Sequence, residues 1–127
     1  MLEQKQNIDK GGAMREDGKI DYVEFPATGL PATKAFYAAA FGWAFTDYGP
    51  DYAAFEGEGT DGGFASDAGS APAKPLVVLY AQDLEAMEAK VRAAGGQVTR
   101  PVFAFPGGRR FHFQDPSGNE LAVWSEG

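Results

Sequence analysis

The sequence predicts an α+β fold made of two tandem βαβββ modules, whose strands form a curved mixed sheet shaped as a cup for a small molecule. Three observations predict this fold. The chain has 127 residues, which leaves room for one domain. Strand and helix patterns follow one another in the same order twice, and the two halves keep the same apolar phase at an offset of 54 residues.

The composition limits what else the chain can be. It has no cysteine, which excludes disulfides, thiolate metal sites and a cysteine nucleophile. Its formal net charge of −7 would repel a phosphate backbone, so we expect no nucleic-acid partner. Apolar runs such as Leu76 to Ala81 are too short to cross a bilayer, and residues 1–19 contain no apolar signal core. We therefore expect a cytoplasmic protein that does not bind membranes.

The first module follows a polar segment at residues 1–18, which we expect to be a flexible arm because it shows no periodicity. A strand is predicted over Ile20 to Pro26 and a helix over about Leu30 to Phe41, with Gly42 placed to end the helix in a left-handed cap. The apolar face of this helix consists of Phe36, Tyr37, Ala40 and Phe41. Three short strands are predicted after the helix, at Trp43 to Tyr48, Asp51 to Gly57 and Gly62 to Ser66.

The second module repeats this order after a linker at Ser66 to Lys74. Leu76 to Ala81 is predicted as a strand, and Asp83 can cap a helix that Gly95-Gly96 stops. Asp115-Pro116-Ser117-Gly118 favours a type I turn between the last two strands. The remaining strands are predicted at Val98 to Phe105, Arg109 to Gln114 and Asn119 to Trp124.

Matching positions in the two halves define the domain boundaries. The pairs at the offset of 54 include Val23 with Val77, Leu30 with Leu84 and Gly42 with Gly96. We therefore predict an arm at 1–18 and a single domain at 19–127, with module one at about 19–69 and module two at about 75–126.

Strand alternation separates two faces of the predicted sheet. One face is wholly apolar and should pack on the helices; it carries Val23, Phe25, Val77, Leu79, Ala81, Leu121 and Val123. The other face mixes aromatic, aliphatic and acidic side chains, as a concave ligand site does. Its members are Tyr22, Glu24, Leu76, Val78, Tyr80, Glu120, Ala122 and Trp124. An ordinary solvated sheet face or a subunit interface is the alternative.

Two segments resemble a known family. Residues 26–43, with Phe36-Tyr37 in a helix and a Gly42-Trp43 stop, resemble the first helix region of the vicinal oxygen chelate superfamily. Residues 113–124, Phe-Gln-Asp-Pro-Ser-Gly-Asn-Glu-Leu-Ala-Val-Trp, resemble its C-terminal strand–turn–strand. The superfamily includes glyoxalases, bleomycin-resistance proteins and extradiol dioxygenases. The chain is most similar to its small glyoxalase-related proteins, and the resemblance covers about residues 19–126.

The resemblance implies a divalent metal held by His and Glu side chains on the cup face. The corresponding positions in this sequence are Tyr22, Leu76, Ala122 and a glycine-rich stretch near Gly63 to Ala65. Leucine and alanine cannot coordinate a divalent ion. We therefore expect no metal cofactor at the usual positions. A displaced site formed by His112, Glu24 and Glu120 is the alternative.

Three groups could carry chemistry on the predicted cup face. Glu24 and Glu120 could act as general acid or base or bind a cationic ligand; alternatively they are solvated at the rim or paired with arginines. His112 is the only histidine and could be catalytic or merely structural. Tyr22, Tyr80 and Trp124 would form an aromatic wall for a planar or cationic ligand, or would simply fill the cup.

The sequence therefore predicts a protein that binds a small molecule in the cup without the usual metal site. The ligand-lining residues are Tyr22, Glu24, Leu76, Tyr80, Glu120, Ala122 and Trp124. The rival hypothesis is an enzyme (a lyase, isomerase or dioxygenase) with displaced metal ligands or with catalysis by Glu24, Glu120 or His112. We expect a homodimer, in keeping with the habit of the superfamily that the chain resembles.

Overall fold

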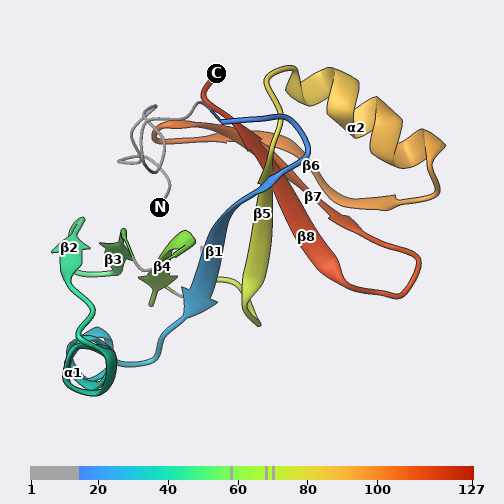
Figure 1. Ribbon diagram of the computed structural model, residues 1–127. Coiled ribbons are helices and arrows are strands. Elements are labelled where there is room, and N and C mark those ends of the chain that lie inside the picture. The colour runs from blue at the N-terminus through green and yellow to red at the C-terminus, as the bar shows by residue number, and fades with distance from the viewer. Residues whose placement is uncertain (1–14, 58, 68, 70) are drawn as a thin grey trace. The chain divides into compact units, whose positions relative to one another are not determined.

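The computed structural model describes residues 15–57, 59–67, 69 and 71–127. In this part of the chain, two helices and eight strands follow in the order β1, α1, β2, β3, β4, β5, α2, β6, β7, β8 (Figure 1). The predicted α+β class and the order of elements in both modules are confirmed. The chain separates into two compact units. The first unit is residues 22–76, and the second unit is residues 77–127 together with 15–21. The rest of the predicted arm, residues 1–14, lies outside the described residues.

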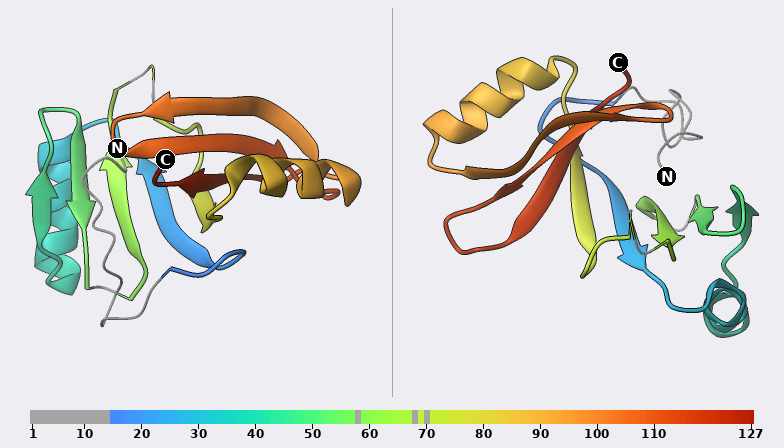
Figure 2. Two further views of the ribbon diagram at one scale, coloured as in Figure 1. Left: turned by 90° about the horizontal axis from the view of Figure 1, so that it is seen from above. Right: turned by 180° about the vertical axis from the view of Figure 1, so that it is seen from behind.

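The first unit contains one helix and a mixed sheet in the order β2-β3-β4-β1. β1 runs parallel to β4, and the other neighbours are antiparallel. Figure 2 shows α1 beside the strands of this unit. The bounds are β1 Ile20–Pro26, α1 Leu30–Phe41, β2 Phe45–Asp47, β3 Tyr52–Phe55 and β4 Asp61–Ala65.

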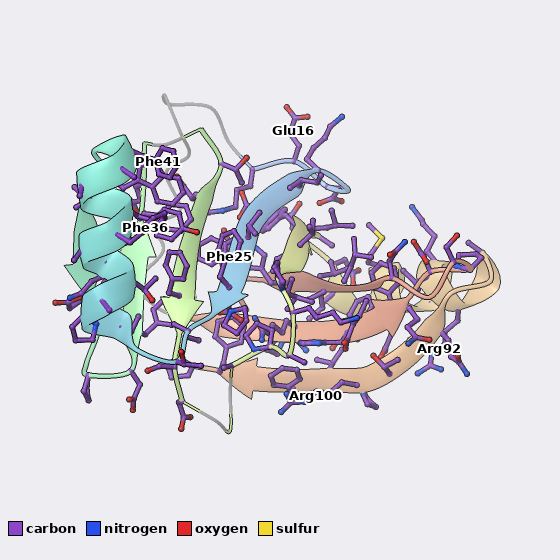
Figure 3. The ribbon with its side chains drawn as sticks, turned by 90° about the horizontal axis from the view of Figure 1, so that it is seen from below. Glu16, Phe25, Phe36, Phe41, Arg92 and Arg100 are labelled. Carbon is purple, nitrogen blue, oxygen red and sulfur yellow. The ribbon has the colours of Figure 1, made fainter. Side chains whose placement is uncertain are left out.

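Helix α1 begins and ends where the sequence predicts. Gly42 takes the left-handed conformation at φ 75°. Its N–H donates to the Ala38 carbonyl at 3.0 Å, and the Trp43 N–H donates to the Tyr37 carbonyl at 3.3 Å. Leu30 and Tyr37, two turns apart, pack against Phe64 on the sheet. The predicted apolar face is only partly right, because Phe36 and Phe41 are 56% and 63% exposed (Figure 3). Phe36 lies about 100° around the helix from Tyr37, which turns it away from the sheet.

The second unit repeats this plan with the sheet order β5-β8-β7-β6, and β5 runs parallel to β8. Asp83 caps α2 by accepting a hydrogen bond from the Ala86 N–H at 3.0 Å. The left-handed residue after the helix is Gly95, at φ 104°. The bounds are β5 Leu76–Tyr80, α2 Leu84–Ala93, β6 Gln97–Phe105, β7 Gly108–Gln114 and β8 Glu120–Ser125.

The predicted apolar sheet face of this unit packs on α2. Leu84 is fully buried and lies in a cluster with Phe111 and Val123, against which Leu79 and Val91 pack. None of the described helices is long and apolar enough to cross a bilayer.

The predicted turn at Asp115 sets the register of β7 and β8. The Asp115 carbonyl accepts from the Gly118 N–H at 3.0 Å, and its carboxylate accepts from the N–H groups of Ser117 and Asn119. The five-residue connection places Gln114 opposite Glu120, His112 opposite Ala122 and Arg110 opposite Trp124. Residues opposite one another share a sheet face, so β7 places Arg110 and His112 on the face that was predicted to line the cup.

Candidate functional site

In the first unit, Tyr22 and Glu24 form a buried hydrogen-bonded chain with Tyr52. The Tyr22 and Tyr52 hydroxyl oxygens are 2.5 Å apart, and the Tyr52 hydroxyl donates to the Glu24 carboxylate at 3.3 Å. A phenol has one proton, so the Tyr22 hydroxyl must donate to Tyr52. Glu24 is completely buried. Strand alternation predicts Tyr22 and Glu24 on one face, but it does not predict Tyr52, which joins them from β3.

The phenols of Tyr22 and Tyr52 both stay neutral. Burial raises the pKa of Tyr22 well above its ordinary value, and the nearby Glu24 and Asp61 charges raise it further. Burial likewise raises the pKa of Tyr52, with added effects from Tyr22 and Glu24. Tyr22 and Tyr52 can therefore contact a bound molecule as neutral hydroxyl groups and not as phenolates.

In the second unit, Tyr80 and Trp124, two of the three residues of the predicted aromatic wall, pack together and already hold a cation. The two rings pack edge to face with centroids 5.7 Å apart, and the Arg15 guanidinium carbon lies 5.1 Å from the Trp124 ring centroid. The Arg15 side chain is only 3% exposed and bridges Asp21 at 3.3 Å and Glu126 at 3.4 Å. This cation–π arrangement is what the sequence predicted for a ligand. Here it is made by the chain itself.

Hydrogen bonds fix the wall on both sides. The Trp124 indole N–H donates to Asp21 at 3.0 Å, and the Tyr80 hydroxyl donates to Glu126 at 2.5 Å. Burial, and then the bond to Glu126, raises the pKa of Tyr80 to about 12. Tyr80 and Trp124 are thus held rigidly, and their polar atoms face acidic groups.

His112 and Glu120 are brought together on the same sheet face. His112 Nδ1 lies 3.2 Å from Glu120 Oε2, which also accepts from the Thr99 hydroxyl at 3.3 Å. The Glu120 side chain is about half exposed, whereas the His112 side chain is 11% exposed. Glu120 therefore lies at the surface as the partner of His112, and Glu24 has its own partner in Tyr52.

The His112 imidazole is neutral at pH 7. Burial, and then the Arg110 charge, lower its pKa to about 4, although the bond to Glu120 opposes both effects. Its second ring nitrogen, Nε2, is buried without a hydrogen-bond partner. Buried polar atoms of this kind are uncommon in folded proteins.

The sequence indicates Arg109 and Arg110 only as possible partners of Glu24 and Glu120, whereas Arg109 pairs with Glu85 and Arg110 lies on this face. Arg110 is 2% exposed, and the guanidinium carbons of Arg100 and Arg110 lie 3.8 Å and 5.6 Å from the centroid of the Phe103 ring. The signal was present in the five-residue turn, which aligns Arg110 with Trp124 and His112 with Ala122. Extending the alternation to β7 would have found both residues.

The positions at which the resemblance implies metal ligands do not fit a divalent ion. A Cβ added at Gly63 would overlap the Tyr52 hydroxyl and lie 2.7 Å from the Tyr22 hydroxyl, so no longer side chain fits there. Tyr22 is a neutral phenol, and Leu76 and Ala122 are buried residues without donor atoms. Among the described residues, no group of three or more His, Asp or Glu side chains gathers at one place.

The first unit also has an open apolar pocket of about 450 Å³, on the helix side of its sheet. This pocket was not predicted from the sequence. It is lined by Phe25, Pro26, Ala32, Thr33, Phe36, Tyr37, Phe64 and Pro75. Since the strand residues among these have the opposite parity to Tyr22 and Glu24, this pocket is separate from the hydrogen-bonded chain.

A family model matches most of this chain, and the curated relatives carry a related name. The model of the Glyoxalase/Bleomycin resistance protein/Dioxygenase superfamily matches residues 19–123. "Putative glyoxylase CFP32" of Mycobacterium bovis and of Mycobacterium tuberculosis is 29% identical in an alignment 118 residues long that covers 84% of this chain. The chain spans 45% of the length of these curated relatives.

Solved structures show the same fold. The Mn(II)-bound glyoxalase from Novosphingobium aromaticivorans is 26% identical with a TM-score of 0.63, over 89% of this chain and 40% of that one. Methylmalonyl-CoA epimerase from Mycobacterium tuberculosis is 14% identical with a TM-score of 0.67, over 91% and 92% of the two chains. The second likeness extends over nearly the whole of both chains and concerns the fold alone.

Proposed function

The chain belongs to the Glyoxalase/Bleomycin resistance protein/Dioxygenase superfamily, and from this we propose that it binds a small organic molecule without the divalent metal that the resemblance implies. One observation carries the proposal. The space beside Gly63, where a ligand side chain would have to stand, is filled by the Tyr22–Tyr52 hydroxyl pair. Leu76 and Ala122 remove two further donors, so the scaffold is kept while the metal positions are closed.

The proposed binding residues are those that the sequence singled out, with the partners that the structure adds. Tyr22 and Glu24 act together with Tyr52 in the first unit. Tyr80, Trp124 and Glu120 belong to the second unit, where Arg15 lies against the wall. The neutral hydroxyls of Tyr22 and Tyr52 and the buried Glu24 carboxylate suit a small polar organic molecule.

Metal-stripped protein tests this proposal. We would screen it by thermal shift against small carboxylates, aldehydes and thioesters, with EDTA or with 1 mM Mn²⁺, and measure the metal content of untagged protein by elemental analysis. We expect at least one compound to raise the Tm equally in both conditions. A stoichiometric transition metal, together with binding that disappears in EDTA, would overturn the proposal.

An enzyme is the second candidate, and the His112–Glu120 pair favours it. The curated relatives are named as glyoxylases, which suggests compounds with adjacent oxygen atoms as substrates. A neutral imidazole held by a carboxylate can move a proton in such a molecule. Incorporation of solvent deuterium into α-carbonyl compounds, followed by NMR, would detect this activity, and we expect His112→Gln to abolish it. Incorporation that His112→Gln leaves intact would point to Glu24 and would be tested with Glu24→Gln.

We also propose that the chain forms a homodimer through α1. Phe36 and Phe41 are exposed beside the apolar pocket, and the only charged residue of α1 is Lys34, which pairs with Asp47 at 2.7 Å. This is a nearly uncharged surface on a chain of net charge −7, so two copies can meet there without strong repulsion. The curated relatives have about twice this chain's length, and a second copy would supply a comparable amount of protein.

A further inference from the structure

His112 Nε2 is a polar atom whose surroundings the proposed function does not yet explain. Glu120 accepts hydrogen bonds and cannot donate one when ionised, so the Nδ1 atom beside it must carry the proton of the neutral ring. Nε2 is then left with its lone pair. It is buried, and no described group donates to it. The fold thus holds a buried hydrogen-bond acceptor for a donor that the described residues do not provide.

The surroundings of His112 are cationic. Arg100 pairs with His112 across β6 and β7, and Arg110 lies two residues away on the same face of β7. The Phe103 ring contacts all three, with its centroid 5.7 Å from the His112 ring. Arg100 is exposed and projects from β6, and no described carboxylate pairs with it (Figure 3). A guanidinium in this setting recognises a carboxylate or phosphate.

We propose that His112 Nε2 and Arg100 form a binding site for a small oxyanion that carries a neighbouring hydroxyl, as a 2-hydroxy carboxylate does. The hydroxyl donates to Nε2 while the oxyanion pairs with the Arg100 guanidinium. The arrangement would discriminate strongly against molecules without the hydroxyl, because they leave a buried acceptor without a donor. This proposal rests on the proposed function and names the ligand class for the face of the second unit.

Access to Nε2 involves Phe103. This side chain lies against the imidazole, and the pairing of β6 with β7 is irregular between Arg100 and Phe103. At such an irregularity the ladder of backbone hydrogen bonds is locally disrupted, so the free-energy cost of shifting the Phe103 side chain is lower than in a regular ladder. The ligand enters when Phe103 shifts from the imidazole ring.

The single histidine makes the test direct. Imidazole ¹⁵N spectra of the full chain at pH 7 report only His112, and we expect the Nδ1–H tautomer. Titration with glycolate should shift the Nε2 resonance. Methoxyacetate and acetate, which lack the hydroxyl, should bind at least tenfold more weakly. Inorganic phosphate, which has both an oxyanion and a hydroxyl, separates phosphate from carboxylate recognition: stronger binding than glycolate would overturn the 2-hydroxy carboxylate assignment.

Matched arginine variants complete the test. Arg100→Gln should weaken glycolate binding at least tenfold, whereas Arg92→Gln, at an exposed position on α2, should leave it unchanged (Figure 3). An Nε2–H tautomer, or equal affinity for glycolate and methoxyacetate, would reject the site. In that case a metal-independent Tm increase by other compounds would still support the proposed function, so the two failures can be told apart.

Discussion

At the scale of single residues, His112 should make stability depend on pH. Its pKa is about 4 in the folded chain and near 6.5 when exposed, so the unfolded chain binds more protons between these values. The contribution of His112 to the free energy of unfolding is therefore complete above pH 6.5 and is lost as the pH drops toward 4. The loss should reach roughly 3 kcal/mol if His112 acts alone.

Urea unfolding at several pH values measures this loss. His112→Gln should flatten the curve between pH 6.5 and 4, because the titrating group is gone. The charged and titratable groups facing His112 are Glu120, Arg110 and Arg100. A variant curve as steep as that of the natural chain would show that other groups cause the acid instability.

Gly63 should tolerate no side chain. Gly63→Ala would drive a methyl group into the Tyr52 and Tyr22 hydroxyls, and we expect a loss of about 1–3 kcal/mol from overpacking. Gly69→Ala is the matched control. An added Cβ there would lie 3.6 Å from the nearest atom, the Asp67 Oδ2, which is an ordinary van der Waals contact. Chemical denaturation compares the two variants, and equal stability would mean that the hydroxyl pair does not close this position.

At the scale of elements, the N-terminal cap of α2 should contribute measurably to stability. The Asp83 side chain accepts from the Ala86 N–H, so Asp83→Ala should lower the free energy of unfolding by about 1 kcal/mol. Asp83→Asn keeps the acceptor and should retain most of that stability. If both variants lost the same amount, the carboxylate charge would matter more than the cap.

Elements with local causes were predictable from the sequence. Pro31, Gly42, Asp83 and the Asp115 turn act within a few residues, and the helices and strands lie close to their predicted bounds. The candidate site was harder to predict from the sequence, because its contacts join segments that are distant along the chain. The Trp124–Asp21 hydrogen bond spans 103 positions, and the Tyr22–Tyr52 pair spans 30. Strand parity assigns a face, but it does not say which side chain from another strand, or from residue 15, will occupy it.

At the scale of the whole molecule, the two repeated units share the same arrangement of helix and strands but differ in the side chains on one sheet face. The first helical residue is buried in both units, as Leu30 and Leu84, and each helix covers the apolar face of a mixed sheet. The opposite faces differ, since one holds a Tyr–Tyr–Glu chain and the other holds arginines and an imidazole. The helix face maintains the fold, which leaves the other face free to vary between the two modules.

The helices also differ in how much of their apolar surface they bury, and this bears on assembly. α2 carries charged residues on its outer side, including the Glu88–Arg92 pair at 3.7 Å, whereas α1 exposes Phe36 and Phe41. Large exposed aromatic side chains beside an apolar pocket are typical of a surface that is covered in the assembled protein. A second copy is the occupant that we propose.

Changing this surface should therefore change the mass in solution. We expect the natural chain to have the mass of two chains by light scattering, and the double variant Phe36→Ser with Phe41→Ser to have the mass of one. Ile20→Ser removes another exposed apolar side chain, 60% exposed on β1, and should leave the dimer intact. A single-chain mass for the natural protein at micromolar concentration would reject the dimer. A dimer that the Phe variants leave unchanged would place the interface away from α1.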